Sequence, residues 1–516
     1  MKNSKLTRRN FLVDAFALGA ASTFLSPTAC LLARTSSQRR ARRPNVLFIA
    51  VDDLRPQLGC YGTATMISPN IDRLASEGIL FERAYCQQPI CMATRASLLS
   101  GYRPDHAHIY DCRSLQEDDP NALTINKWFE QNGYDIWATG KIYHYPEDHK
   151  AQFGKRWVRA KGNWVGRGYL SPKSIRQVKK YAKIYPKLRG HGRTSDGRGP
   201  AFEAADVPDN AYEDGAQTEL AIAQLQKFKN AKKPFFMAVG YHKPHLPFNA
   251  PKKYWDMYDA EKINLADNPF LPKNATEFTR YNFNELRNYY DIPKDEKPLP
   301  DDLARQLIHG YYACVTYTDA QIGRLLSELH RLGLRKNTVI VLWGDHGWKL
   351  GEHAMWCKHT PFELDAHVPL IFSAPGLAHT GEHSRAFAEF VDIYPTLCEL
   401  CGLKRPRHLQ GDSLVPVLRN PKRPWKKAAF TQWPKVARRN PNKVITAYSI
   451  KTDRYRYIEW TRNKTGKVLA RELYDHQVDP EENENIANDP KNKAIVSRLS
   501  KLLFGGRGWR RLRPLI

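Results

Sequence analysis

Two pairs of side chains in this 516-residue chain are suited to binding a metal ion. Asp52 and Asp53 follow the apolar run 46–51, and Asp345 and His346 follow a second apolar run of the same kind. Adjacent carboxylates at the end of a buried strand are costly unless a cation neutralises them. Because oxygen-rich ligand sets suit hard cations, we expect calcium or magnesium here. The alternative is that each pair only caps a turn or a helix.

Cys91 is the candidate nucleophile, and Arg95 lies one helical turn further along. The residues that follow, up to Gly101, favour a helix that begins at or near Cys91. Free backbone amides, the helix dipole and the guanidinium would all favour a nucleophile that handles an anion there. The Cys-x-x-x-Arg spacing alone has little specificity, since ordinary residue frequencies produce it by chance in roughly half of chains this long. It gains weight from the neighbouring metal-binding pairs.

Further cationic and titratable side chains follow the expected strands. Lys141 and His144 come after strand 134–139, and His242 comes after the next strand. Lys358 lies in the polar loop after the second metal-binding pair. A single Lys or His of this kind is more often a surface residue or a structural core residue. Collected around one metal ion, they supply positive charge and proton-transfer groups, which suits cleavage of a sulfate or phosphate ester.

The elements that must position these residues alternate between strands and helices, which predicts an α/β sheet. In open α/β sheets ligands bind beyond the carboxyl ends of the strands, so we expect the polar clusters to converge on one site. The expected strands are 46–51, 134–139, 235–239, 338–343 and 368–373, and the expected helices are 71–77 and 125–132. Beyond about residue 422 an antiparallel pair at 447–451 and 455–461 indicates a small C-terminal subdomain. The polar stretch 264–300 is expected to be a surface excursion.

The formal net charge of +27 favours an acidic partner such as nucleic acid, an anionic membrane or a sulfated polysaccharide. We expect no nucleic-acid partner, because the chain has no helix-turn-helix, zinc-finger or single-strand-binding signature. Between residues 160 and 200 there are eleven Lys or Arg residues and one acidic residue. This segment is either a solvated basic excursion or a rim that binds a polyanion.

Residues 1–30 have the layout of a twin-arginine export signal, and a basic linker follows at 31–43. Arg8 and Arg9 precede a mostly apolar run that is too short to span a bilayer stably. We therefore expect a periplasmic or extracellular protein with no transmembrane span in the mature chain. Cys30 lies in a poor lipoprotein box, so a lipid anchor there is disfavoured. The alternative is a basic tail ahead of a core helix.

Nine cysteines are present, and setting aside Cys30 and Cys91 leaves an odd number, so not all of them can pair. Cys398 and Cys401 have the spacing of a redox or zinc pair. They lie in an apolar, helix-like stretch with no second pair nearby, which favours core cysteines.

Taken together, these residues resemble the formylglycine-dependent sulfatase family, and within it the iduronate-type members. Cys91 to Arg95 resembles the family's cysteine signature, in which the cysteine is oxidised to formylglycine before it can act. The other matches follow in the family's order: Asp52-Asp53, Gly140-Lys141 with His144, 240–245, 345–348 with 350–353, Lys358, 367–370 and 472–475. The resemblance extends from about residue 44 to residue 489. One departure is Ala93, where most members have proline, and this position concerns the enzyme that oxidises Cys91.

The resemblance implies an α/β, alkaline-phosphatase-like sandwich, with a large mixed central sheet between helices and a small antiparallel C-terminal sheet. We place the catalytic domain at 44–421 and the C-terminal subdomain at 422–516. The implied metal is one calcium ion, with magnesium as the weaker choice, and its implied ligands are Asp52, Asp53, Cys91, Asp345 and His346. The implied catalytic residues are Cys91, Arg95, Lys141, His144, His242 and Lys358.

The family's mechanism gives each of these residues a role. Hydrated formylglycine at Cys91 attacks sulfur while Arg95 and the metal stabilise the attacking group. Lys141 and Lys358 neutralise the sulfate oxygens. His242 protonates the departing sugar oxygen, and His144 removes the proton whose loss expels sulfate.

The resemblance implies two partners, a sulfated saccharide and a formylglycine-generating maturation enzyme. It points to a 2-O-sulfated uronate at a chain end, but the core motifs define sulfate cleavage and leave the sugar, and exo or endo action, open. One rival is a phosphatase or phosphodiesterase of the same fold, and Cys91 with Arg95 argues against it because those enzymes generally use Ser or Thr. The other rival is a catalytically silent relative that binds polyanions.

Overall fold

The computed structural model describes residues 43–105, 113–184, 197–280, 284–295, 297–435 and 444–505. The expected export signal at 1–30, and the linker as far as residue 42, lie outside these ranges. None of the helices within them is long and apolar enough to cross a membrane.

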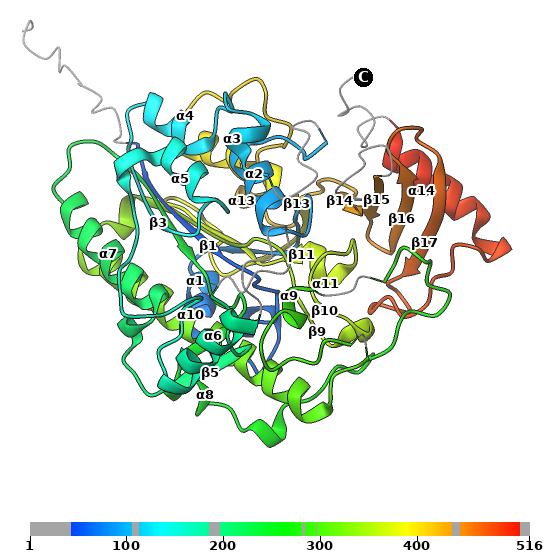
Figure 1. Ribbon diagram of the computed structural model, residues 1–516. Helices are drawn as coiled ribbons and strands as arrows, with labels where there is room; N and C mark the ends of the chain where they lie inside the picture. Colours follow the sequence, from blue (N-terminus) through cyan, green and yellow to red (C-terminus); the bar gives the residue numbers. More distant parts are fainter. Residues whose placement is uncertain are drawn as a thin grey trace, which may run out of the picture. The chain divides into compact units, whose positions relative to one another are not determined.

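A mixed sheet forms the centre of the described chain (Figure 1). Its strands are β1 (Asn45–Val51), β2 (Ile79–Tyr85), β3 (Asp135–Gly140), β4 (Trp157–Val158), β6 (Phe235–Tyr241), β8 (Thr338–Gly344), β11 (His367–Val368), β12 (Leu370–Ser373) and β13 (His383–Glu389). They lie in the order β11-β2-β12-β8-β1-β6-β3-β4, and β13 pairs with β2. Because β1 is parallel to β6 and β8, and β6 is parallel to β3, these four strands end at the same edge.

Alternating side chains of β1 enter two hydrophobic cores, one on each face of the sheet. Leu47 and Val51 belong to one core, and Phe48 and Ala50 belong to the other. The first face is covered by α1 (Pro69–Ser76), α7 (Glu213–Phe228) and α10 (Asp301–Arg331). The second face is covered by α2 (Cys91–Ser100), α4 (Ile125–Gln131), α5 (Pro146–Phe153) and α12 (Ile393–Leu400). Burial on both faces explains why the strands read as continuous apolar runs.

A four-stranded antiparallel sheet follows near the C-terminus (Figure 1). Its strands, in order, are β14 (Ala429–Lys435), β15 (Ile445–Lys451), β16 (Tyr455–Arg462) and β17 (Val468–Asp475). Helix α14 (Lys493–Phe504) packs on this sheet through Leu499 and Leu503. The backbone amide of Gln432 donates a hydrogen bond of 2.8 Å to the carbonyl of Gln87, which ties this sheet to the main body.

The main strands and helices expected from the sequence are confirmed, with their ends shifted by no more than two residues. The expected strand 368–373 is divided into β11 and β12 at Pro369, which has no amide to donate to a ladder. The stretch 264–300 differs from the expected surface excursion. Leu286 and Tyr289 are buried in it, and α9 (Asn284–Arg287) carries Glu285 toward the strand ends.

The described cysteines are all free thiols: Cys60, Cys86, Cys91, Cys314, Cys357, Cys398 and Cys401. Cys398 lies in α12 and Cys401 directly follows it, and both are buried among apolar side chains. The expectation of core cysteines at this pair is confirmed.

Arg456 joins the C-terminal sheet to the loops of the main sheet. It is 1% exposed, its Nε lies 2.6 Å from the Glu482 carboxylate, and its Nη2 pairs with Glu363. We predict that Arg456→Met lowers the free energy of unfolding by about 3–5 kcal/mol, because two carboxylates lose a buried partner.

Denaturant unfolding measures this loss, with the exposed Arg462→Met on the same strand as the control. Equal stabilities of the two variants, within about 0.5 kcal/mol, would show that the buried pairs do not hold the sheet.

Candidate active site

The carboxyl ends of four parallel strands bring the expected site residues together. Val51 pairs with Gly344 of β8 and with Tyr241 of β6, so the residues that follow these strands leave the sheet side by side. Gly140 of β3 pairs with Gly240 of β6, which adds the loop that carries Lys141. The convergence expected from the strand pattern is therefore confirmed.

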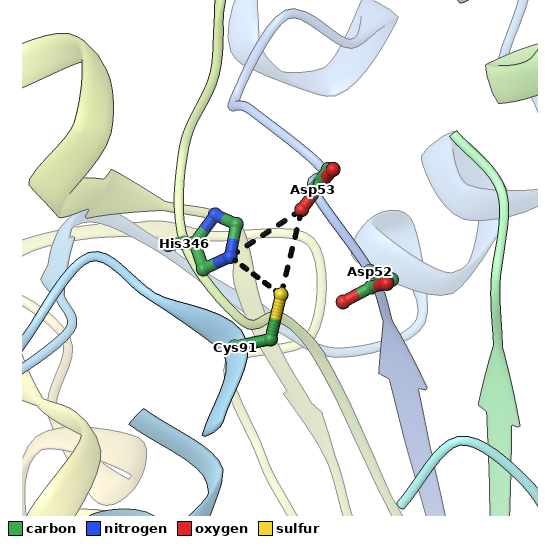
Figure 2. Close-up of side chains that lie close together, drawn as sticks. All are labelled: Asp52, Asp53, Cys91 and His346. Carbon is green, nitrogen blue, oxygen red and sulfur yellow. Dashed lines mark hydrogen bonds and ion pairs between the residues drawn. The ribbon is translucent and has the colours of Figure 1, made fainter. Parts of the chain in front are cut away.

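Asp53, Cys91 and His346 meet in a buried cluster beside Asp52 (Figure 2). The Cys91 Sγ lies 3.2 Å from His346 Nε2 and 3.9 Å from Asp53 Oδ1. His346 Nε2 lies 3.3 Å from Asp53 Oδ1 and 3.6 Å from the nearer oxygen of Asp345. The oxygen, nitrogen and sulfur atoms of one potential metal site thus lie within 4.8 Å of one another.

The backbone around Asp53 fixes the direction of its carboxylate. Asp53 has a positive φ of 58°, a left-handed conformation that Asp tolerates better than most residues. Its amide donates to Asp345 Oδ1 at 2.9 Å, and its carbonyl accepts from the Tyr311 hydroxyl at 2.9 Å. These two bonds compensate for the unfavourable conformation.

The cluster fits a divalent cation. His346 Nδ1 lies 3.0 Å from the Gly347 carbonyl, which can only accept, so Nε2 presents its lone pair to Asp53 and Asp345. Burial, together with repulsion from Asp52, raises the pKa of Asp53 to about 7 even though Lys358 opposes the shift. Several acceptor atoms therefore face one another in the buried cluster, and a hard cation is the partner they suit.

Arg95 forms ion pairs with two of the candidate metal-binding carboxylates. Its side chain is fully buried, with Nε 2.9 Å from Asp345 and Nη2 3.2 Å from Asp52. Nη1 donates to the carbonyls of Lys141 and Ile142. The guanidinium therefore orients two candidate ligands and fastens the loop after β3.

Lys141 and Lys358 approach the cluster from two sides. Lys141 pairs with Asp52, and Lys358 Nζ lies 3.1 Å from Asp53 Oδ1. The pKa of each ammonium is raised, because the carboxylates outweigh the cost of burial. Both side chains thus remain charged beside the Cys91 sulfur.

Cys91 is the first residue of α2, where the helix presents its free amides. Burial, reinforced by the charge of Asp52, raises the pKa of the Cys91 thiol well above its ordinary value. The helix N-terminus therefore does not produce a thiolate here. An unmodified Cys91 is a weak nucleophile at neutral pH.

His242 is held by Asp214 at the start of α7. The Asp214 carboxylate accepts the backbone amides of His242 and Lys243 at 2.9 and 2.7 Å, and it lies 3.5 Å from His242 Nδ1. Burial lowers the pKa of His242, but Glu213 and Asp214 outweigh it, so the net shift is upward. Protonated imidazole is thereby favoured.

His144 has the opposite electrostatic setting. Its side chain is exposed at the rim of a cavity of about 340 Å³, whose lining also includes Lys141 and His242. Desolvation by the surrounding protein, together with the charge of Lys141, lowers the pKa of His144. A neutral imidazole able to accept a proton therefore faces the same cavity as His242.

Three residues of the site, Glu285, Asp214 and His245, were assigned no role from the sequence. Glu285 Oε2 lies 3.0 Å from Lys358 Nζ, and Glu285 Oε1 lies 3.0 Å from His245 Nε2. Asp214 supports His242 as described. His245 follows a predicted strand and was visible as a candidate, but no local pattern marks Glu285 or Asp214.

Comparison with known proteins places this geometry in context. The chain matches the family model of the sulfatases over residues 44–403, and the model described as N-sulphoglucosamine sulphohydrolase, C-terminal, over residues 351–507. Iduronate 2-sulfatase of Homo sapiens is 33% identical over 533 residues, covering 88% of this chain and 93% of that protein. A sulfatase of Formosa agariphila is 31% identical, covering 93% of this chain and 91% of the relative.

Solved structures share the architecture. A phosphonate monoester hydrolase of Agrobacterium radiobacter superposes with a TM-score of 0.67 at 22% identity, covering 90% of this chain and 95% of that chain. A 2-O GAG sulfatase superposes with a TM-score of 0.65 at 23% identity, covering 90% and 91% of the two chains. The alkaline-phosphatase-like fold is thereby confirmed, and the two structures show that this fold serves more than one kind of ester cleavage.

We predict that Asp214→Asn makes His242 titrate at a lower pH, because the neutral amide removes one of the charges that keep the imidazole protonated. NMR of selectively labelled histidines before and after the substitution measures this shift. His383, which lies on the distant strand β13, serves as the internal control. An unchanged His242 titration would mean that the charge of Asp214 does not affect the pKa of His242.

Proposed function

Because the chain belongs to the sulfatase family, we propose that it hydrolyses sulfate esters of sulfated sugars, using formylglycine formed from Cys91 as the nucleophile. The observation that carries this proposal is the position of Cys91. It lies at a helix N-terminus against buried carboxylates, with the charged side chains Lys141 and Lys358 on either side. Such a setting suits an anionic ester brought to a metal-assisted nucleophile.

The environment of Cys91 argues against an unmodified thiol as the nucleophile. A thiol whose pKa is raised by burial and by Asp52 gives little thiolate at neutral pH. Formylglycine, when present, supplies a hydrated aldehyde whose reactivity does not depend on thiol ionisation. We therefore propose a formylglycine-generating enzyme as a maturation partner, which must accept Ala93 within the signature.

We propose calcium as the metal, bound by Asp52, Asp53, Asp345, His346 and the modified Cys91. When bound, calcium would neutralise the carboxylates and polarise a sulfate oxygen. Oxygen atoms dominate this ligand set, which favours calcium over zinc. Arg95 keeps Asp52 and Asp345 in place.

Two lysines and two histidines complete the proposed reaction. Lys141 and Lys358 balance the charge on the sulfate oxygens. His242, whose pKa is raised, donates a proton to the departing sugar oxygen, and His144, whose pKa is lowered, accepts a proton from the nucleophile residue. Opposed pKa shifts on two groups facing one cavity are the expected arrangement for an acid and a base.

The substrate is proposed from the relatives. Identity of 33% to an iduronate 2-sulfatase over most of both chains favours a saccharide bearing a 2-O-sulfated uronate. The layout of residues 1–30 supports twin-arginine export to the periplasm or beyond. The family match at 44–403 supports a catalytic domain at 44–421, with the remaining residues as a C-terminal subdomain.

The reaction is tested by measuring sulfate release from sulfated disaccharides by ion chromatography, using protein made together with a maturation enzyme. We predict release from a 2-O-sulfated uronate disaccharide and a loss of at least about 1,000-fold in Cys91→Ala, because the nucleophile is removed. Cys86→Ala alters another buried thiol nearby and should retain most activity.

Comparable release by Cys91→Ala would refute the assigned nucleophile. Hydrolysis of phosphonate or phosphate monoesters in place of every sulfate ester would favour the rival reaction on this fold.

The metal site is tested by titrating calcium into metal-free protein by calorimetry, with thermal unfolding as a second readout. We predict that calcium raises the unfolding temperature, since it binds the folded state, and that Asp53→Asn weakens its affinity on the order of 10-fold or more. Glu352→Gln changes a partly buried carboxylate that pairs with Arg55 outside the cluster, and serves as the control. Equal calcium affinity in both variants would place the ion elsewhere.

A further inference from the structure

A basic excursion begins beside the cavity that contains the proposed catalytic residues. Between residues 155 and 184 the chain has ten Lys or Arg residues and no Asp or Glu. Part of this segment, from Trp157 to Gly168, contributes to the cavity wall through Trp157, Arg159, Ala160, Gly166, Arg167 and Gly168. Helix α6 (Pro172–Ile184) follows directly (Figure 1).

The excursion is fastened at its base next to the cavity. Gly166 and Gly197 both have positive φ and touch so closely that a Cβ on Gly166 would lie 2.2 Å from the Gly197 carbonyl oxygen. The Arg167 amide donates to that carbonyl at 3.0 Å. Asn249 donates to the Gly168 carbonyl at 2.9 Å. Because these contacts fix the backbone of residues 166–168, the segment that leads into α6 is held at a defined place beside the cavity wall.

One face of α6 packs onto the body of the protein. Val178 and Tyr181 are buried, and the Tyr181 hydroxyl donates to the Asn288 carbonyl at 2.7 Å. At the N-terminus of the helix, the Glu203 carboxylate accepts the amides of Leu170 and Ser171. These contacts orient the helix about its own axis.

The opposite face of α6 carries only positive charge. At 100° per residue, Arg176, Lys179 and Lys183 point directly away from the buried side chains. All three are exposed, and in the described part of the chain none of them forms an ion pair. Lysines and arginines three or four residues apart repel one another on a helix, so this stripe destabilises α6 unless an anion neutralises it.

We propose that the outward face of α6 binds the sulfated polysaccharide chain beyond the residue held in the cavity. This inference rests on the proposed function and adds to it that the substrate is a polymer held at several sites. A helix of this length is about 20 Å long, so it can span several sugar units. Regularly spaced sulfate and carboxylate groups complement a regularly spaced row of cations better than a compact anion would.

The test compares Arg176→Gln/Lys179→Gln/Lys183→Gln with Lys493→Gln/Arg498→Gln/Lys501→Gln on α14, which removes the same charge from another exposed helix. Binding of a heparin dodecasaccharide is measured by calorimetry in a Cys91→Ala background, so that no turnover occurs. We predict that the α6 variant weakens binding about 10-fold, because three exposed ion pairs are lost. The salt dependence of its binding should also become shallower.

Turnover of a sulfated disaccharide, measured with Cys91 intact, should be the same in the α6 variant and the wild type. The inference is overturned if the α6 and α14 variants bind the dodecasaccharide equally, or if oligothymidine binds α6 as tightly as the dodecasaccharide does. If polymer binding depends on α6 but no disaccharide releases sulfate, the proposed binding surface is supported and the proposed sulfatase reaction is refuted. If a disaccharide releases sulfate but polymer binding does not depend on α6, only the proposed binding surface is refuted.

Discussion

The need to neutralise buried carboxylates determines the organisation of the site. Asp52, Asp53 and Asp345 leave the ends of two central strands with no exposure to solvent. Unpaired, each would cost several kcal/mol. The fully buried Arg95 and the lysines Lys141 and Lys358, which come from two other loops, form ion pairs with these carboxylates. The groups that neutralise the carboxylates therefore also bring positive charge close to Cys91.

This arrangement separates the properties of chemically similar groups. Asp52 has its pKa lowered, because the pull of Lys141, His245 and Arg95 overcomes burial, whereas the pKa of its neighbour Asp53 is raised to about 7. The pKa values of His242 and His144 diverge in the same way. Desolvation and the charge of Lys141 lower the pKa of His144, whereas Glu213 and Asp214 outweigh these effects at His242. Different neighbours, supplied by different loops, thus give paired residues different chemistry.

Much of the site could be predicted because its signals are local. Apolar runs that end in Asp52-Asp53, Lys141, His242 and Asp345-His346 show both the strands and the residues at their ends. Glu285 could not be found in this way, since α9 has only four residues and lies within a polar stretch. Its contact with Lys358 depends on tertiary packing that no periodicity encodes.

Asp214 was missed for a related reason. Its position at the start of α7 resembles an ordinary acidic first turn of a helix. Only the antiparallel packing of α7 against β6 brings it to the His242 amide. The conformation at Asp53 was equally invisible, because a positive φ in a non-glycine residue leaves no pattern in the sequence. Local signals therefore located the groups that do chemistry, whereas the groups that position them required the fold.

Mass spectrometry of the peptide that contains Cys91, taken from a preparation that releases sulfate, tests the central claim most directly. We predict that the residue is formylglycine and that the converted fraction rises in proportion to activity across preparations. An active preparation whose Cys91 carries an unmodified thiol would contradict the proposed nucleophile.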